Sequence, residues 1–257
     1  MKVATFNVNS IRSRLDTVVG WLATHKPDVL AVQETKTTND TFPHLALAAT
    51  GYEVVFHGET GYNGVALLSR RKPTDVRFGF DDGEQADRDR LLVARIGPVH
   101  VVNTYIPQGR SIDNPMYRYK IQWLQRLRAH FERHFTPRQK VLWMGDLNVA
   151  PDPIDIYNSD QQKNHVAFHE DVRHAFAQTL DWGFVDVFRK HRPEAGQYTF
   201  FDYRQKDSVT ANKGWRVDHI LATPALARTS RNAWVDMAPR RAPGSSDHTV
   251  VVAEFDI

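Results

Sequence analysis

The 257-residue sequence contains no cysteine. This absence excludes disulfide bonds, thiolate metal sites and cysteine nucleophiles, so a bound metal would have to rest on Asp, Glu, Asn or His. No stretch approaches the roughly 18 to 20 consecutive apolar residues of a membrane span. The N-terminal MKVATFNVNS lacks the charged start and apolar segment of a secretory signal. We therefore expect a cytoplasmic protein with no membrane partner, and a monomer by default.

The sequence also has no large excess of charge of either sign. The formal net charge is only +3, from 33 basic and 30 acidic residues. This excess favours a nucleic-acid partner only weakly, and local clusters of Lys and Arg matter more than the total. Several such clusters are present, and each taken alone is typical of a solvated surface. They are Arg70-Arg71-Lys72, Arg110, Arg118-Tyr119-Lys120, Arg126-Leu127-Arg128, Arg204-Gln205-Lys206 and Arg240-Arg241.

Short strands dominate the pattern of apolar residues, and no linker or repeat divides the chain. The expected strands are Val3–Phe6, Val29–Gln33, Tyr52–Phe56, Gly64–Ser69, Leu91–Ile96, Val99–Tyr105, Val141–Gly145, Phe184–Val187, Tyr198–Phe201, Val217–Ala222 and Val250–Phe255. The expected helices are Arg12–Thr24, Phe42–Ala48, Asn114–His134 and Asp171–Trp182. This is too much strand for a Rossmann unit, and it lacks the strict alternation of a barrel. We expect one α/β domain over residues 1–257, with two packed mixed sheets and helices on their outer faces.

Polar residues stand at the ends of many of these strands. In VLWMGDLNVAP, for example, a buried strand is followed by Asp146 and Asn148. Residues i and i+2 of a strand face the same way, so these two side chains would project together if the extended conformation persists. Each such residue alone is typical of a turn or cap. Together they predict one polar pocket at the mouth of a strand core, built from Asn7, Asn9, Glu34, Tyr105, Asp146, Asn148, Asp218, Asp247 and His248.

Carboxylates, carboxamides and one histidine suit a hard cation such as Mg²⁺ or Mn²⁺. Such a cation commonly serves phosphate chemistry. Hydrolysis of a phosphodiester needs an oriented water, a base, positive charge on the phosphoryl oxygens and stabilisation of the leaving alkoxide. Asp146 can serve as the base, Glu34 can hold the metal, and Asn7 and His248 can bond phosphate oxygens. Asp218 can pair with one ring nitrogen of His248 and favour its charged form.

Six motifs in order, FNVNSIR, LAVQETK, YIPQG, GDLNVAP, WRVDHIL and SSDH, resemble the exonuclease III / apurinic-apyrimidinic (AP) endonuclease family. This family is part of the endonuclease/exonuclease/phosphatase superfamily. The resemblance extends from Val3 to about Phe255 and implies a four-layer α/β sandwich. It also implies a Mg²⁺-dependent phosphodiesterase, with Mn²⁺ as a substitute, that acts on double-stranded DNA.

By this resemblance, Glu34 is the principal metal ligand, with Asn7, Asn9 and Asp247 close to the metal. By the same resemblance, Asp146 activates the attacking water, Tyr105 contacts the scissile phosphate or stabilises the leaving group, and Asn148 holds a phosphate oxygen. Asp218 orients His248. One departure lies beside this histidine, where Thr249-Val250 replace the usual Ala-Pro or Cys-Pro.

The segments around these motifs indicate the substrate. TFFDYR followed by GWRVD matches the DNA-repair branch, in which residues equivalent to Phe200, Trp215 and Val217 form an apolar pocket for a flipped-out abasic sugar. The alternative is that these are ordinary core side chains. YIPQGRSIDNPMYRYK places a second group next to the catalytic tyrosine, where the family grips the DNA backbone. Its members are Gln108, Arg110 and Lys120, with Arg118 beside them.

The expected function is thus cleavage of DNA 5′ to abasic sites, with removal of 3′ nucleotides or 3′ blocking groups. An alternative is a 3′-exonuclease or 3′-phosphatase with little abasic-site activity, and the loop at residues 157–169 would set that balance. Its His165 and His169 are not expected to bind metal. Two further alternatives are a lipid or inositol phosphodiesterase, insensitive to salt and to duplex DNA, and a non-catalytic DNA-binding module. The latter would have lost some of the strand-end polar groups, all of which are present here.

Overall fold

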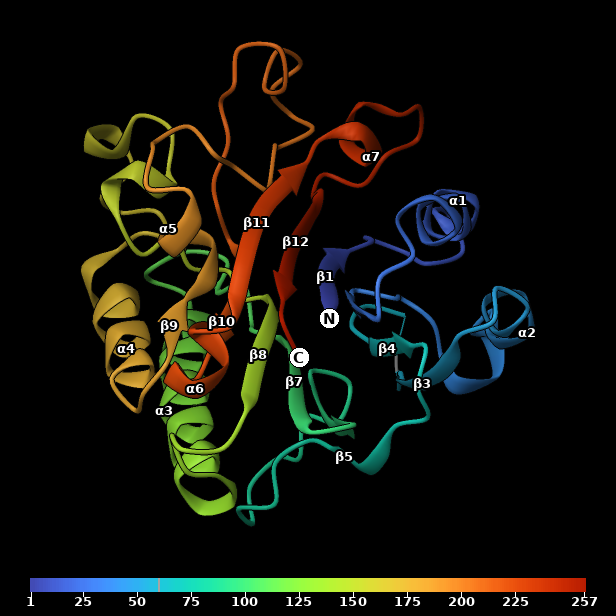
Figure 1. Ribbon diagram of the computed structural model, residues 1–257. Helices are drawn as coiled ribbons and strands as arrows, with labels where there is room; N and C mark the ends of the chain where they lie inside the picture. Colours follow the sequence, from blue (N-terminus) through green and yellow to red (C-terminus); the bar gives the residue numbers. More distant parts are fainter. Residues whose placement is uncertain (60) are drawn as a thin grey trace.

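Two mixed six-stranded sheets form the centre of the computed structural model, which describes residues 1–59 and 61–257 (Figure 1). The first sheet has the order β11 (Ser230–Asp236), β12 (Val250–Phe255), β1 (Lys2–Asn7), β2 (Val29–Gln33), β4 (Val65–Ser69) and β3 (Glu53–His57). The second has the order β5 (Thr74–Phe78), β6 (Leu91–Ile96), β7 (Val99–Tyr105), β8 (Val141–Asp146), β10 (Asp218–Ala222) and β9 (Val185–Asp186). The β1–β2 and β7–β8 pairs are parallel, and the other pairs are antiparallel.

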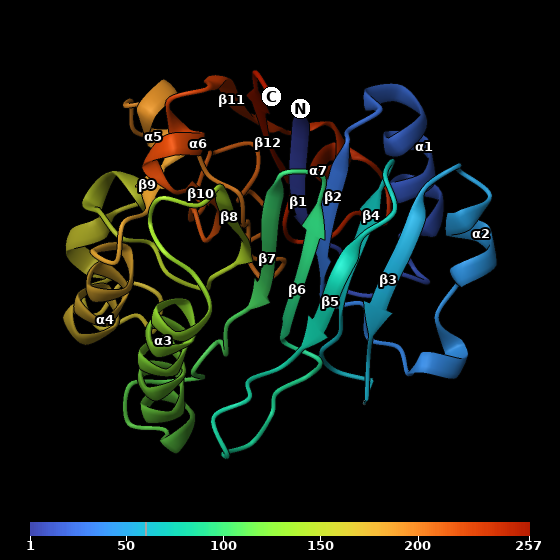
Figure 2. The same ribbon diagram turned by 60° about the horizontal axis from the view of Figure 1, so that its bottom comes forward.

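Helices cover the outer face of each sheet (Figure 2). The longer ones are α1 (Leu15–His25), α3 (Pro115–His134) and α4 (Glu170–Leu180), and the short ones are α2 (His44–Ala48), α5 (Val187–His191), α6 (Pro224–Ala227) and α7 (Ala238–Arg241). Helices α1 and α2 pack on the first sheet, and α3 and α4 pack on the second. The expected four-layer sandwich is therefore confirmed. Within the described residues, no helix is both long enough and apolar enough to span a membrane.

Alternation along the strands places each side chain in one of two cores. In β1, Ala4 and Phe6 pack toward α1, whereas Val3 faces the second sheet. In β8, Trp143 packs toward α3, whereas Leu142 and Met144 face the first sheet. The inter-sheet rows of β1 and β8 continue to Asn7 and Asp146. The apolar core between the sheets therefore ends in polar side chains.

A polar bridge crosses the otherwise apolar seam between the two sheets. Gln33 of β2 donates from its side-chain nitrogen to the Asn103 side-chain oxygen of β7, over 2.7 Å. Asn103 in turn donates to the carbonyl oxygens of Val32 and Ala66, over 3.1 and 2.9 Å. Gln33 also exchanges hydrogen bonds with the hydroxyl of Thr5. These buried groups are satisfied only when the two sheets take this one relative position.

Most expected elements are confirmed to within a few residues, and three groups are not. Strands β5 and β11 were missed, as were the short helices α5, α6 and α7. The expected strand Tyr198–Phe201 is wrong, because Phe200 makes only isolated bridges, to Trp215 and to His248. The chain there crosses the mouth of the sandwich instead of joining a sheet.

Gly145 allows a tight approach directly before Asp146. Its φ is +145°, and a Cβ at this position would lie 2.0 Å from the carbonyl oxygen of Thr104 in β7. Gly145→Ala should lower the free energy of unfolding by more than about 1 kcal/mol, because the β7–β8 pair would have to move apart. Gly20→Ala is the control, since Gly20 lies in α1 and a Cβ added there would have no neighbouring atom within 4 Å. It should stabilise the protein by about 0.5–1 kcal/mol. Urea denaturation measures both, and equal stabilities would contradict the steric argument.

Candidate active site

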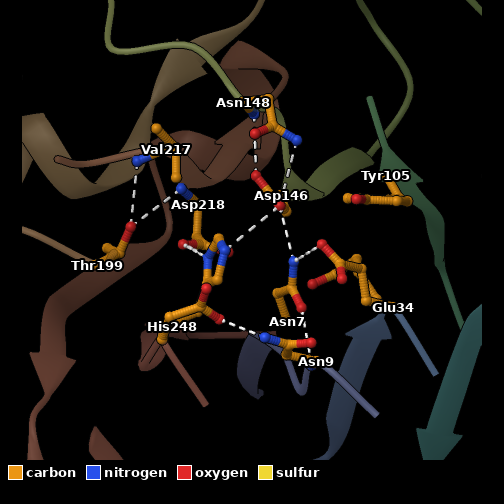
Figure 3. Close-up of polar contacts among 12 residues, drawn as sticks. Asn7, Asn9, Glu34, Tyr105, Asp146, Asn148, Thr199, Val217, Asp218 and His248 are labelled. Carbon is orange, nitrogen blue, oxygen red and sulfur yellow. Dashed lines mark hydrogen bonds and ion pairs between the residues drawn. The ribbon is translucent and has the colours of Figure 1, made fainter. Parts of the chain in front are cut away.

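Strand register brings three of the expected site residues into one row. Asp146 of β8 lies opposite Tyr105 of β7 on one side and Asp218 of β10 on the other. All three side chains are on the face toward the first sheet. From that sheet, Asn7 reaches across and donates to Asp146 Oδ2 over 2.8 Å. Both sheets therefore contribute to one site at the same end of the sandwich (Figure 3).

Left-handed turns, not continued strands, place the next side chains. β1 ends at Asn7 and β8 ends at Asp146, and then Asn9 and Asn148 have φ of 43° and 52°. The expectation that the chain stays extended through Asn9 and Asn148 is therefore wrong. The side-chain oxygens of Asn7 and Asp146 accept the backbone N–H groups of Asn9 and Asn148, each over 3.0 Å. These Asx turns fold the chain back, so the side chains still converge. Glu34, with φ of 49°, also takes this strained conformation, which is frequent at functional sites.

A buried histidine links two of the carboxylates. His248 Nδ1 lies 2.8 Å from Asp218 Oδ2, and its Nε2 lies 3.7 Å from Asp146 Oδ2. Burial lowers the pKa of His248, but the charges of Asp218 and Asp146 outweigh it and raise this pKa to about 10. Burial raises the pKa of Asp146, the charge of His248 opposes this rise, and the carboxylates of Asp218 and Glu34 add to it, so that the pKa stays above its usual value. His248 is therefore an imidazolium at neutral pH, and Asp146 can exchange a proton there.

The other half of the site gathers oxygen ligands around Glu34. Asn7 Nδ2 donates to Glu34 Oε1 over 3.0 Å, and Asn9 Nδ2 donates to Asp247 Oδ1 over 2.9 Å. The ammonium of Lys36 lies 2.9 Å from Glu34 Oε2 and also donates to Asn9 Oδ1. Burial opposes ionisation of Glu34, but Lys36 and Asn7 hold its pKa below its usual value. The ammonium of Lys36 thus already lies among these carboxylate and carboxamide oxygens. Because a hard divalent cation prefers such oxygens as ligands, the donor set fits one.

Tyr105 and Asn148 border the same space. Burial raises the pKa of Tyr105 well above its usual value, and the charges of Glu34 and Asp146 add to this effect. Its hydroxyl therefore stays protonated and can donate. The guanidinium of Arg90 lies 4.8 Å from the centre of the Tyr105 ring. Asn148 donates from Nδ2 to the Ile106 carbonyl oxygen and to Asp146 Oδ2, over 2.9 and 3.3 Å.

An aromatic wall stands beside His248. The rings of Phe200 and Trp215 stack with centroids 5.1 Å apart, and Phe200 meets the His248 ring edge-on at 4.9 Å. Val217, which is buried, continues the wall. A cavity of about 220 Å³ lies here, lined by these three residues together with Glu34, Tyr105, Gln108, Asp146, Asn148, His165, Ala167, Asp202, Arg204, Asp247 and His248. Phe200 and Trp215 are half-buried and line a cavity, so they are not ordinary core side chains.

The expectation that Lys120 grips DNA is wrong, because its side chain is fully buried. Its ammonium donates to the carbonyl oxygens of Gln108, Asn148 and Val166, over 3.3, 2.6 and 2.8 Å. Lys120 thus ties together three segments that border the cavity. Gln108 and Arg110 are exposed, and Gln108 lines the cavity, so their expected DNA contact stays a prediction.

Sequence reasoning missed the buried charges behind the aromatic wall. Arg216 alternates with Trp215 and Val217 and points the other way. Its Nε donates to Asp155 Oδ1 over 2.6 Å, and its Nη1 lies 2.8 Å from Asp186 Oδ2. This network anchors the wall. In the sequence, the alternation of Trp215, Arg216 and Val217 along an extended chain is the one signal that Arg216 faces away from the cavity.

Two further residues differ in role from the sequence analysis. His165 stacks on Trp215, with ring centroids 4.7 Å apart, so it is a cavity residue. Burial lowers its pKa to about 4, so its ring is neutral. Thr249, which replaces the usual alanine or cysteine, donates its hydroxyl to the Asp236 carbonyl and its N–H to the Thr199 carbonyl. His248 keeps its bond to Asp218 beside this substitution.

Comparisons with known proteins agree with this geometry. The family model described as endonuclease/exonuclease/phosphatase matches residues 4–248. Exodeoxyribonuclease III of Haemophilus influenzae is 31% identical, over 99% of this chain and all of its own. Among solved structures, an AP endonuclease from Archaeoglobus fulgidus is 50% identical, with a TM-score of 0.98 and full coverage of both chains. A 3′ phosphatase from Neisseria, bound to a product DNA hairpin, is 37% identical, with a TM-score of 0.92 and full coverage of both chains.

The first prediction from this site concerns the charge on His248 in metal-free protein. The raised pKa of His248 means that its pairing stabilises the fold fully below about pH 6.5 and that this contribution is lost as pH rises toward about 10. In Asp218→Asn protein the pKa of His248 should fall. The decrease in the free energy of unfolding as pH rises should then become smaller. Nitrogen NMR of the His248 ring, with urea denaturation at pH 6 and 9, measures both effects. Asp207→Asn is the control, because Asp207 is an exposed partner of Lys213. A His248 pKa near its usual value in wild type would refute the pairing.

A second prediction concerns Lys120. Lys120→Met should lower the free energy of unfolding by about 2–5 kcal/mol, because three buried carbonyl oxygens lose the amino group that donates to them. Arg118→Met changes an exposed residue of the same helix and should stay within about 0.5 kcal/mol of wild type. Denaturant unfolding compares the two. Equal stabilities would show that Lys120 does not hold the three segments.

Proposed function

The chain belongs to the endonuclease/exonuclease/phosphatase family, and we propose that it is a Mg²⁺-dependent DNA-repair phosphodiesterase that cleaves duplex DNA on the 5′ side of abasic sites. Within the family it is an exonuclease III / AP endonuclease-type hydrolase. The observation that carries the proposal is the apolar wall of Phe200, Trp215 and Val217 directly beside His248 and Asp146. A sugar without a base can enter such a pocket, and unstacking costs least at a damaged site.

The side chains supply the steps of phosphodiester hydrolysis. Asp146, held by Asn7 and Asn148, accepts a proton from the water whose oxygen attacks phosphorus. The bond from phosphorus to the 3′ oxygen breaks, which leaves a 3′-hydroxyl and a 5′-phosphate. The imidazolium of His248, fixed by Asp218, offsets the charge on the phosphoryl oxygens. Tyr105, whose hydroxyl stays protonated, would donate toward the phosphate or the leaving oxygen.

Glu34, with Asn7, Asn9 and Asp247, would hold the metal. Bound Mg²⁺ supplies positive charge to the phosphoryl oxygens and to the departing alkoxide. Two or more carboxylates with carboxamides and no sulfur ligand favour Mg²⁺ or Mn²⁺ over softer ions. Because the net charge is only +3, the DNA contacts depend on local groups; Gln108 and Arg204 are exposed and line the cavity, and Arg110 is exposed two residues after Gln108.

One observation favours a second candidate function, removal of 3′ nucleotides or 3′ phosphates with little abasic-site cleavage. His165 occupies the cavity wall against Trp215 and reduces the space for a flipped-out sugar. A terminal 3′ group needs no such pocket, because it reaches the metal and Asp146 from the end of a strand. The similar Neisseria structure is named a 3′ phosphatase.

One experiment separates the two functions. A duplex with a single internal abasic analogue and an undamaged duplex with a recessed 3′ end are each incubated with enzyme in Mg²⁺ or EDTA. The products are sized on a denaturing gel. We expect one Mg²⁺-dependent cut 5′ of the lesion, and no cut with Asp146→Asn protein. A ladder from the 3′ end, with the lesion left intact, would contradict abasic-site cleavage and support the removal of 3′ nucleotides.

A parallel arm with His165→Ala protein tests the cavity wall. If His165 restricts the pocket, the ratio of abasic-site cleavage to 3′ trimming should rise, because only the first reaction uses the pocket. His174→Ala is the matched control, since His174 is an exposed histidine of α4 outside the cavity. An unchanged ratio in His165→Ala protein would remove His165 from the specificity argument.

A further inference from the structure

A second group of metal-ligating side chains lies away from the cavity, at the C-terminal end of α3. His130 and His134 are one turn apart, so their side chains share one face of the helix. The segment between β5 and β6 passes beside this helix end and contributes Asp81 (Figure 1). None of these residues lines the candidate active site.

The three side chains converge closely. His134 Nε2 lies 3.0 Å from Asp81 Oδ1, and His130 Nδ1 lies 4.0 Å from the same oxygen. One ligand atom from each of the three residues lies within 4.8 Å of the others. Small side-chain rotations would bring such atoms to the spacing that one metal ion requires.

His130 provides an independent observation. Its side chain is 3% exposed, and within residues 1–59 and 61–257 neither of its ring nitrogens has a hydrogen-bond partner. A buried polar group left in this state costs about 1–3 kcal/mol. Burial, with the neighbouring His134, lowers the pKa of His130 to about 4, so the ring is neutral at pH 7. A neutral imidazole with a free lone pair is the form that binds metal.

From this arrangement we infer that Asp81, His130 and His134 form a second metal site, which takes Zn²⁺. Two imidazoles and one carboxylate, with a fourth position left to solvent, are a common zinc ligand set. Mg²⁺ prefers oxygen ligands alone, so this site would not compete for the ion expected at Glu34. When Nε2 of a neutral His134 ring binds the ion, the ring proton is carried on Nδ1, so the imidazole stays neutral and its hydrogen bond to Asp81 is replaced by the bond to the metal.

Two arginines oppose the cation and limit its affinity. Arg133 Nη2 lies 3.6 Å from Asp81 Oδ1, and Arg77 Nη1 lies 3.4 Å from His134 Nδ1. The Arg133 side chain is 42% exposed and can turn into solvent when the ion binds. The bond from Arg77 is at the long limit for a hydrogen bond and is cheap to lose. Zinc bound here would fasten the β5–β6 segment to α3.

The test is calorimetric titration of Zn²⁺ into full-length, metal-stripped protein in excess Mg²⁺, which occupies the oxygen ligands around Glu34. Wild type should bind one Zn²⁺ that His134→Ala protein binds at least about tenfold more weakly. Asp81→Asn should also weaken it. His174→Ala, which changes an exposed histidine outside the cluster, should titrate as wild type does. Both His134 and Asp81 lie near the surface, so neither change should prevent folding.

Two further readouts distinguish this site from zinc bound at His248. Zn²⁺ should raise the melting temperature of wild type, but not that of His134→Ala protein, because a ligand that binds only the folded state stabilises it. Crystals grown with Zn²⁺ should give an anomalous peak between His130 and His134. Identical titrations and melting shifts in wild type and His134→Ala, or a peak only at His248, would overturn the inference.

Discussion

The hydrogen bond between Gln33 and Asn103 is the contact on which the site depends, because it fixes how the two sheets lie against each other. An apolar seam alone would tolerate sliding, since dispersion contacts are not directional. Gln33 and Asn103 are fully buried, and a shift of either sheet would leave their donors and acceptors unpaired at a cost of about 1–3 kcal/mol each. One layer further along the same seam, Asn7 meets Asp146. The polar bridge thus aligns two half-sites that come from different sheets.

The same seam explains the electrostatics of the site. Carboxylates from both sheets meet in a space closed by apolar walls, where repulsion is strong and hydration is poor. Side chains that are neutral or positively charged reduce this repulsion between the carboxylates. Asn7 is a neutral donor to Glu34 and Asp146 at once, and an aspartate in its place would add a further charge. The excess of negative charge raises the pKa of both His248 and Asp146, and burial raises that of Asp146 further while opposing the rise for His248. A site so arranged is stabilised by any cation that enters it.

The strand ends were predictable because alternation and polar punctuation are local properties of the sequence. Strand β5 was missed because its side chains are mostly exposed and carry no apolar alternation. The segment Tyr198–Phe201 has strand-like residues, yet tertiary bridges to Trp215 and His248 determine its path. Lys120 was assigned to the surface by its charge. Its position on α3, three residues after Tyr117 and four before Leu124, placed it on the buried stripe, and this periodic signal should have outweighed residue type.

Buried cations also change how the charge of this chain is understood. Lys120 and Arg216 count toward the net charge of +3, but both are fully buried: Arg216 pairs with the carboxylates of Asp155 and Asp186, and Lys120 donates to backbone carbonyl oxygens. Neither can release counterions from DNA, so phosphate contacts have to come from the exposed Lys and Arg side chains. Their role is mechanical. Lys120 fixes the carbonyl groups of three segments at the cavity, and Arg216 fixes the segment that carries Trp215. Two buried cations thus hold rigid the segments that give the cavity its shape.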